Sequence, residues 1–199
     1  MPRGRPPKFD EQQVLDTAAA MFKRDGYDAV SVADLSKETG MAMQSLYHRF
    51  GDKAGLYREA LNRYGRTAND PQIEALLNEP DAAAALRNFV RAWRRHAGAD
   101  ASGGCLFTQA MAGADPSRGL GELEVTCAFT DRLRKALRKR VAEAQAAGDV
   151  PAGSPGAGPG EVADGLMTLA FGVAVIGRGG MPAAMVDHAV RAGLRLLGE

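Results

Sequence analysis

Apolar residues recur at every third or fourth position along most of this 199-residue chain, and no stretch alternates as a half-buried strand would. The first segment shows the pattern clearly, since Val14, Leu15, Ala18, Met21 and Phe22 share one helical face. With 24 Gly and 10 Pro, the chain has many points at which one helix ends and the next begins. These patterns predict an all-α protein of about nine helices.

Two short helical segments lie on either side of Gly40. Ser31 and Asp34 have the spacing of a capping box, which predicts that the first of them runs from residue 31 to about Thr39. The second is expected from Met43 to Arg49, and Gly40 permits the tight turn between them. Such a pair is a helix-turn-helix, expected at about residues 31–50. Its small core is expected from Leu35, Met41 and Leu46.

The region around this unit resembles the TetR family of bacterial transcription regulators. The resemblance extends over about residues 3–64. Its marks are Phe22, Gly26-Tyr27, Ser31-Val32, Leu35, Gly40, Ser45-Leu46-Tyr47, Phe50, Lys53 and Leu56-Tyr57. Ala42 departs from the pattern, because Ser or Thr often stands there and would cap the second helix.

The resemblance implies a division of the chain into three parts. A basic arm at residues 1–9 precedes a helix-turn-helix DNA-binding domain at 10–67, and residues 68–199 form a ligand-binding and dimerisation domain. The sequence Asn69-Asp70-Pro71 is expected to break the helical pattern between the two domains.

The second helix of such a unit lies in the major groove and offers its first residues to base edges. Gln44 has the amide that pairs with an adenine edge, and Ser45 can donate or accept. Tyr47 and His48 follow within the next turn, within reach of phosphates or bases. The resemblance implies the same four positions as DNA contacts.

Further DNA contacts are expected outside this helix. The resemblance places Ser31 and Lys53 at phosphate-contacting positions, and Lys53 also begins a helix, whose free amides attract phosphate. In the arm, Arg3, Arg5 and Lys8 are expected to enter the neighbouring minor groove or to lie along phosphates.

The remaining helices should enclose an apolar pocket for a small-molecule effector. Trp93 and His96 lie three residues apart on one expected helix and are the first candidates for contact with a ligand. The whole candidate lining is Phe89, Trp93, His96, Cys105, Phe107, Met111, Phe129, Met167 and Phe171.

Cys105 allows a second way of sensing. It is expected in the first turn of a helix, where the dipole stabilises a thiolate that an oxidant or electrophile could attack. A free cysteine is also often a small buried hydrophobe, so both roles stay open. Cys127 shares a helical stripe with Leu123 and Leu137 and is expected in the core.

The last two expected helices carry apolar stripes suited to a dimer interface, and a two-fold operator needs a two-fold protein. The residues of these stripes are Val162, Leu166, Leu169, Val173, Ile176, Val186, Val190, Leu194 and Leu197.

Composition bounds the remaining possibilities. The net charge is only +1, so DNA contact must come from local placement of charge. The two cysteines suit a reducing cytoplasm, and no signal peptide or membrane span is expected. No cofactor or metal is expected, because the three His and two Cys are scattered and no catalytic motif is visible.

The expected function is therefore that of a homodimeric repressor, released from a palindromic operator by a small molecule. Three alternatives remain at this point: a repressor switched through the Cys105 thiol, a non-specific architectural DNA binder, and a small helical enzyme.

Overall fold

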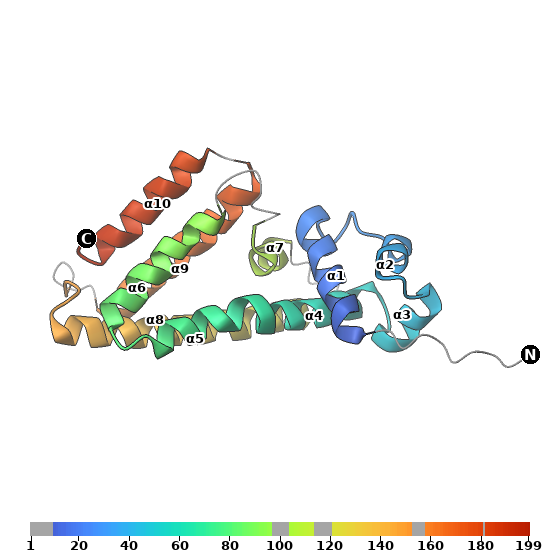
Figure 1. Ribbon diagram of the computed structural model, residues 1–199, viewed down its shortest axis with the longest axis horizontal. Helices are drawn as coiled ribbons and strands as arrows, with labels where there is room; N and C mark the ends of the chain where they lie inside the picture. Colours follow the sequence, from blue (N-terminus) through green and yellow to red (C-terminus); the bar gives the residue numbers. More distant parts are fainter. Residues whose placement is uncertain (1–9, 97–103, 114–120, 153–157, 181) are drawn as a thin grey trace, which may run out of the picture.

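A computed structural model of the chain describes residues 10–96, 104–113, 121–152, 158–180 and 182–199, and every regular element among them is helical (Figure 1). The α-helices are α1 (Glu11–Asp25), α2 (Val32–Thr39), α3 (Met43–Phe50), α4 (Lys53–Tyr64), α5 (Asp70–Asn78), α6 (Ala82–Arg91), α7 (Leu106–Ala112), α8 (Gly121–Ala147), α9 (Pro159–Arg178) and α10 (Ala183–Leu196). A π-helical turn, η1 (Gly65–Asn69), follows α4, and a 3-10 turn, η2 (Ala92–His96), follows α6. The all-α prediction with an N-terminal helix-turn-helix is confirmed.

The first helix is held against α4 by an aromatic cluster. Its N-terminus is capped by Asp10, whose carboxylate accepts from the Gln12 amide at 2.9 Å. Phe22 is fully buried, and its ring meets the Tyr57 ring edge-on at 4.8 Å between centroids. Tyr27 packs on the same Tyr57 ring at 4.9 Å. This cluster fixes the position of α1 relative to α4, and these two helices support α2 and α3.

The helix-turn-helix forms where the sequence predicts it. Ser31 and Asp34 make both bonds of the capping box at the start of α2. Gly40 has φ +70°, a left-handed conformation that side chains with a Cβ rarely adopt, and this turns the chain from α2 into α3. Ala42 makes no side-chain cap at α3, as expected from its lack of a hydroxyl.

The expected helix break at Asn69-Asp70-Pro71 is wrong. The π-helical turn η1 carries the chain from α4 into α5 without a loop. Pro71 is tolerated because it lies in the first turn of α5, where an amide has no intrahelical partner in any case. Because α4 and α5 join in this way, the ten α-helices make nine continuous rods in the described part of the chain. The rod from α4 to α5 links the helix-turn-helix to the rest of the molecule.

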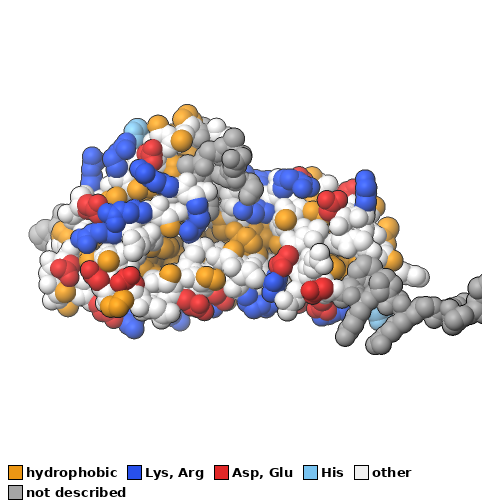
Figure 2. Space-filling model, in the orientation of Figure 1, with side chains coloured by type: hydrophobic (Ala, Val, Ile, Leu, Met, Phe, Trp, Pro, Cys, Tyr) orange, Lys and Arg blue, Asp and Glu red, His pale blue; other side chains and the backbone are white. Residues whose placement is uncertain are grey.

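The second half of the molecule is a bundle arranged around α8. This 27-residue helix packs against α4, α5, α6, α7 and α9, and α10 covers α9 and η2. In Figure 1, α2 and α3 lie at one end of the molecule, and α10 and the C-terminus lie toward the other. Figure 2 shows hydrophobic side chains gathered near the middle of this face, with lysine and arginine side chains around them.

The predicted dimer stripes lie largely inside one subunit, which leaves little surface for a partner on most of these residues. Six of the nine side chains are at most 7% exposed, namely Val162, Leu166, Val173, Val186, Val190 and Leu197. The other three, Leu169, Ile176 and Leu194, are half-buried. The residues of these stripes are buried by the packing of α9 and α10 on each other and on the rest of the bundle. The large apolar side chains exposed on these helices are instead Val175, Met185 and Leu196.

Two further expectations concern the burial of Cys127 and the absence of membrane-spanning segments. Cys127 is exposed on α8, so its predicted place in the core is wrong. Helix α9 is long and apolar enough to span a membrane by length and composition alone, although it packs here against α8 and α10. Only 28% of its most apolar window is buried within the chain.

Candidate functional site

Helix α3 has one buried and one exposed face. Leu46 and Phe50 point into the core, at 3% and 9% exposure, and anchor the helix. The residues on its other side, Met43, Gln44, Ser45, Tyr47 and His48, are all exposed. Tyr47 is 46% exposed, so its phenol is not a core group and is available to a partner. The helix therefore offers to solvent the four side chains that the sequence assigns to base and phosphate contact.

The exposed face of α3 adjoins the beginning of α1. Gln44, Ser45 and His48 line a groove together with Glu11 and Val14 of α1. An ion pair closes the end of this groove, because Arg49 Nε donates to Glu11 Oε2 at 2.7 Å. The start of α1 thus lies beside α3. The predicted arm contacts Arg3, Arg5 and Lys8 lie outside the described residues.

Ser31, a predicted phosphate contact, already has a structural role. Its hydroxyl donates to Asp34 Oδ2 at 2.5 Å, and its Oγ accepts from the Asp34 amide at 3.1 Å. The Ser31 hydroxyl, together with the Ser31 backbone amide that donates to the same Oδ2 at 3.2 Å, holds the pKa of the Asp34 carboxyl below its usual range, and the negative charge complements the start of α2. Ser31 is exposed, but its hydroxyl would have to leave Asp34 before it could donate to a phosphate.

Lys53 lies at the first position of α4, as predicted. Asp52 caps the helix by accepting from the Gly55 amide at 2.7 Å. The Lys53 ammonium lies 4.3 Å from the centre of the Tyr27 ring, a cation–π contact that holds the side chain in place. A charge fixed at a helix N-terminus is well placed to bind phosphate.

A cavity of about 350 Å³ lies between the helices of the bundle. Five predicted lining residues contribute to its wall: Phe89, Trp93, Cys105, Phe129 and Phe171. Three others do not line it. Phe107 is buried between Tyr64 and Phe129, at ring distances of 5.8 and 5.0 Å, and Met111 and Met167 are half-buried elsewhere. The side chain of His96 lies outside the described residues.

The cavity also has polar lining that sequence reasoning missed. These residues are Lys23, Tyr64, Asn69, Gln72, Arg95 and Thr108. Tyr64 and Asn69 lie at the two ends of the π-helical turn, which sequence reasoning took as a helix end. Arg95 lies two residues beyond Trp93. The prediction that Trp93 and His96 line the cavity was the only sequence signal that pointed to this segment.

Cys105 lies in the cavity wall at the N-cap of α7, half-buried. The Tyr64 hydroxyl donates to its sulfur at 4.0 Å. Gly104 precedes it with φ +71° and passes so close to α9 that a Cβ there would lie 2.5 Å from the Ala174 carbonyl oxygen. Only glycine fits this approach, and it fixes where Cys105 enters the wall.

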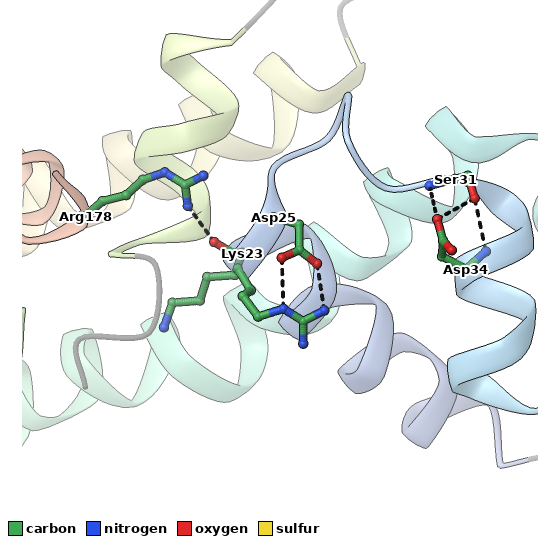
Figure 3. A network of polar contacts seen from close by, with 6 residues as sticks. Lys23, Asp25, Ser31, Asp34 and Arg178 are labelled. Carbon is green, nitrogen blue, oxygen red and sulfur yellow. Dashed lines mark hydrogen bonds and ion pairs between the residues drawn. The ribbon is translucent and has the colours of Figure 1, made fainter. Parts of the chain in front are cut away.

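The last turn of α1 connects the cavity to the helix-turn-helix. Lys23 lines the cavity, and its backbone carbonyl accepts from Arg178 Nη1 of α9 at 2.6 Å and from Gln109 Nε2 of α7 at 3.1 Å. Figure 3 shows Arg178 reaching Lys23 from α9, with Ser31 and Asp34 on the next helix beyond the turn. These two hydrogen bonds join α7 and α9 to the last turn of α1.

These features define a class of protein. A helix-turn-helix with an exposed polar recognition helix, mounted on a helical bundle with an internal cavity, is the arrangement of a DNA-binding regulator. The profile described as "Bacterial regulatory proteins, tetR family" matches residues 14–60. The repressor ComR of Escherichia coli K12 is 31% identical over 156 residues, covering 75% of this chain and 71% of ComR. The chain belongs to the TetR family of transcriptional regulators and is not an enzyme.

Two further relatives agree. The repressor BdcR of Escherichia coli K12 is 33% identical over 114 residues, covering 57% of this chain and 58% of BdcR, so the match spans little more than half of that protein. A cysteine mutant of the TetR-family regulator CifR, solved in complex with 26-bp operator DNA, is 28% identical. It superimposes with a TM-score of 0.76 over 95% of this chain and 99% of CifR.

Replacing Lys53 tests the phosphate contact. Lys53→Ala should weaken binding to specific and non-specific DNA alike, and should reduce the slope of log affinity against log salt by about one per subunit. Fluorescence anisotropy over a salt series measures this slope. Lys135→Ala, which removes an exposed lysine from α8, is the matched control and should leave it unchanged. A Lys53→Ala slope equal to that of the wild type would contradict the contact.

Proposed function

We propose that this protein is a cytoplasmic repressor that binds a palindromic operator as a homodimer and is released by a small-molecule effector. The observation that carries the proposal is the exposed polar face of α3, held outward by Leu46 and Phe50. Each subunit would insert one α3 into the major groove, with centres about 34–36 Å apart for successive grooves. Gln44, Ser45, Tyr47 and His48 would contact DNA there, and Ser31, Lys53 and the basic arm would contact the backbone.

The relatives support this proposal. ComR and BdcR are both named as transcriptional repressors. CifR, which aligns with nearly the whole chain, was solved on double-stranded operator DNA. Repression and operator binding are therefore the functions that we extend to this chain.

Dimerisation follows from apolar surface that one subunit leaves uncovered. Helix α9 is apolar but is buried over little of its length, and Val175 on it is 56% exposed. Leu196 of α10 lies beside α9, 3.8 Å from where a Cβ on Gly165 would stand. Exposed apolar surface of this kind marks an interaction site. A second copy covering the outer face of α9 and α10 would bury it and pair the two recognition helices.

Release requires a link between cavity and α3, and Lys23 provides it. An effector filling the cavity would press on α7 and α9, which hold the Lys23 carbonyl through Gln109 and Arg178. Movement of α1 would change the spacing between the two α3 helices and lower operator affinity. By linkage, operator DNA must weaken effector binding by the same factor.

Gln44 is the most direct test of base readout. Gln44→Ala should relax preference at one base pair of each half-site, at a cost of roughly 1–3 kcal/mol, because the bidentate amide contact with adenine is lost. Anisotropy with a set of single-base operator variants measures the preference. Affinity for non-specific DNA should not change, which serves as the control. A mutant that ranks all operator variants as the wild type does would show that Gln44 does not read a base.

Leu196 tests the dimer face. Leu196→Glu should raise the dimer dissociation constant at least about 100-fold, because an unpaired carboxylate would be buried between subunits. Sedimentation velocity measures the change, and operator affinity should fall with it. The matched control is Leu77→Glu, the same replacement at a leucine that is similarly exposed on α5. Loss of the dimer in both variants, or in neither, would argue against this face.

A thiol switch at Cys105 is the second candidate, favoured by its place in the cavity wall against Tyr64. Alkylation by N-ethylmaleimide would place a bulky group in the cavity and imitate an effector. Treated wild-type protein should then release operator DNA, and Cys105→Ser should not. Cys127→Ser, which removes the exposed cysteine, should behave as the wild type does. Release that persists in Cys105→Ser would exclude this switch.

A further inference from the structure

We infer that the effector is an organic carboxylate with an apolar body, held with its anionic group toward Arg95 and its body among the aromatic residues of the cavity. The inference rests on the proposed function, because it identifies the chemistry of the effector that the cavity would take.

The charged residues of the cavity wall are all basic in the described part of the chain. Lys23 enters from α1 and Arg95 from η2, and no Asp or Glu contributes to the described lining. The positive charge of Arg95 in this wall favours an anion over a cation. A cationic ligand would meet no countercharge from these residues.

Arg95 differs from the paired arginines of this protein. Asp16 raises the pKa of Arg63 and Asp164 raises the pKa of Arg134, each by a hydrogen-bonded ion pair. Burial instead lowers the pKa of Arg95, whose guanidinium donates only to the neutral Gln72 side chain among the described residues. Arg95 is nonetheless an exposed residue, so burial removes only part of its hydration, and no carboxylate from the described chain compensates its charge.

Two buried donors in the same wall also have no acceptor. The indole Nε1 of Trp93 and the side-chain Nδ2 of Asn69 make no hydrogen bond, although the two residues are only 2% and 3% exposed. Buried polar groups in native proteins nearly always have partners, but these two nitrogens have almost no accessible surface, so each would donate to an acceptor in the cavity only after its side chain shifted. The Tyr64 hydroxyl, whose pKa is raised by burial, already donates to Cys105 Sγ at 4.0 Å and would have to leave the sulfur before it could donate to a ligand. A carboxylate is acceptor-only and can bind several such groups together with an arginine.

The rest of the wall suits an apolar body. Phe89, Phe129, Leu133 and Phe171 surround the cavity, whose volume of about 350 Å³ is at the small end for a drug-sized ligand. Gln72, Phe89 and Arg95 also line a groove between α5 and α6 on the other side. They therefore lie between the cavity and that groove, whose lining also includes Glu79.

Trp93 provides a direct readout, since it is the only tryptophan of the chain and lines the cavity. We would titrate wild-type protein with butanoate, octanoate, benzoate and 3-phenylpropanoate, and with the primary amide of each, following Trp93 fluorescence and confirming by calorimetry. At least one carboxylate should bind roughly tenfold or more tightly than its amide, because only the carboxylate pairs with Arg95. Equal affinity within every pair, or no binding by any carboxylate, would overturn the inference.

Two arginine variants test whether Arg95 causes the preference for carboxylate over amide. Arg95→Gln should lose the preference for carboxylate over amide but should keep its affinity for the amide, which also shows that the cavity is still folded. The matched control is Arg94→Gln, on the same turn, where the arginine pairs with Asp187 and does not line the cavity. It should keep the wild-type preference. A preference that survives in Arg95→Gln would contradict the assignment.

Operator binding is measured separately by anisotropy, so the repressor proposal and the carboxylate inference can fail independently of each other. If only the amides released the operator, the repressor proposal would stand, but the inference that the effector is a carboxylate would be overturned. Carboxylate binding in a protein that ignores operator DNA would support the cavity chemistry and overturn the repressor proposal.

Discussion

The arrangement of this molecule depends on the burial of Leu46 and Phe50. Helix α3 has only eight residues and no side-chain cap, so it would not be stable in isolation. It persists because these two side chains pack into the core that α1 and α4 build around Phe22 and Tyr57. The same packing decides which residues face outward, because a helix anchored on one side must present the other. Recognition of DNA is thus a consequence of how a short helix is stabilised.

The two parts of the chain are mechanically joined rather than linked by a flexible segment. The π-helical turn makes α4 and α5 one rod, and it also brings Asn69 into the cavity wall. Lys23 belongs to the DNA-binding half and lines the cavity as well. Since packed helices move as units, the proposed release would couple occupancy of the cavity to the position of α1. A regulator built in this way needs no separate relay between its two sites.

The helix-turn-helix could be predicted from sequence because its signals are local. Ser31 with Asp34 and the glycine at 40 specify caps and a turn within a few residues. The surface that buries the apolar stripes could not be predicted in this way, since periodicity shows that Leu166 or Val190 is buried but not whether its own subunit or a partner buries it. The polar cavity residues were missed because a charged side chain such as Arg95 has no apolar pattern to reveal it. Its place in the cavity wall is formed only when the fold brings η2, α5 and α7 together.

The central claim is that paired α3 helices read the two major grooves of a symmetric site. Sequencing the DNA fragments that the purified protein selects from a random library tests this claim most directly. The account predicts a palindromic consensus whose half-sites are centred about one helical turn, or a whole number of turns, apart. A non-palindromic consensus, or no consensus at all, would contradict it.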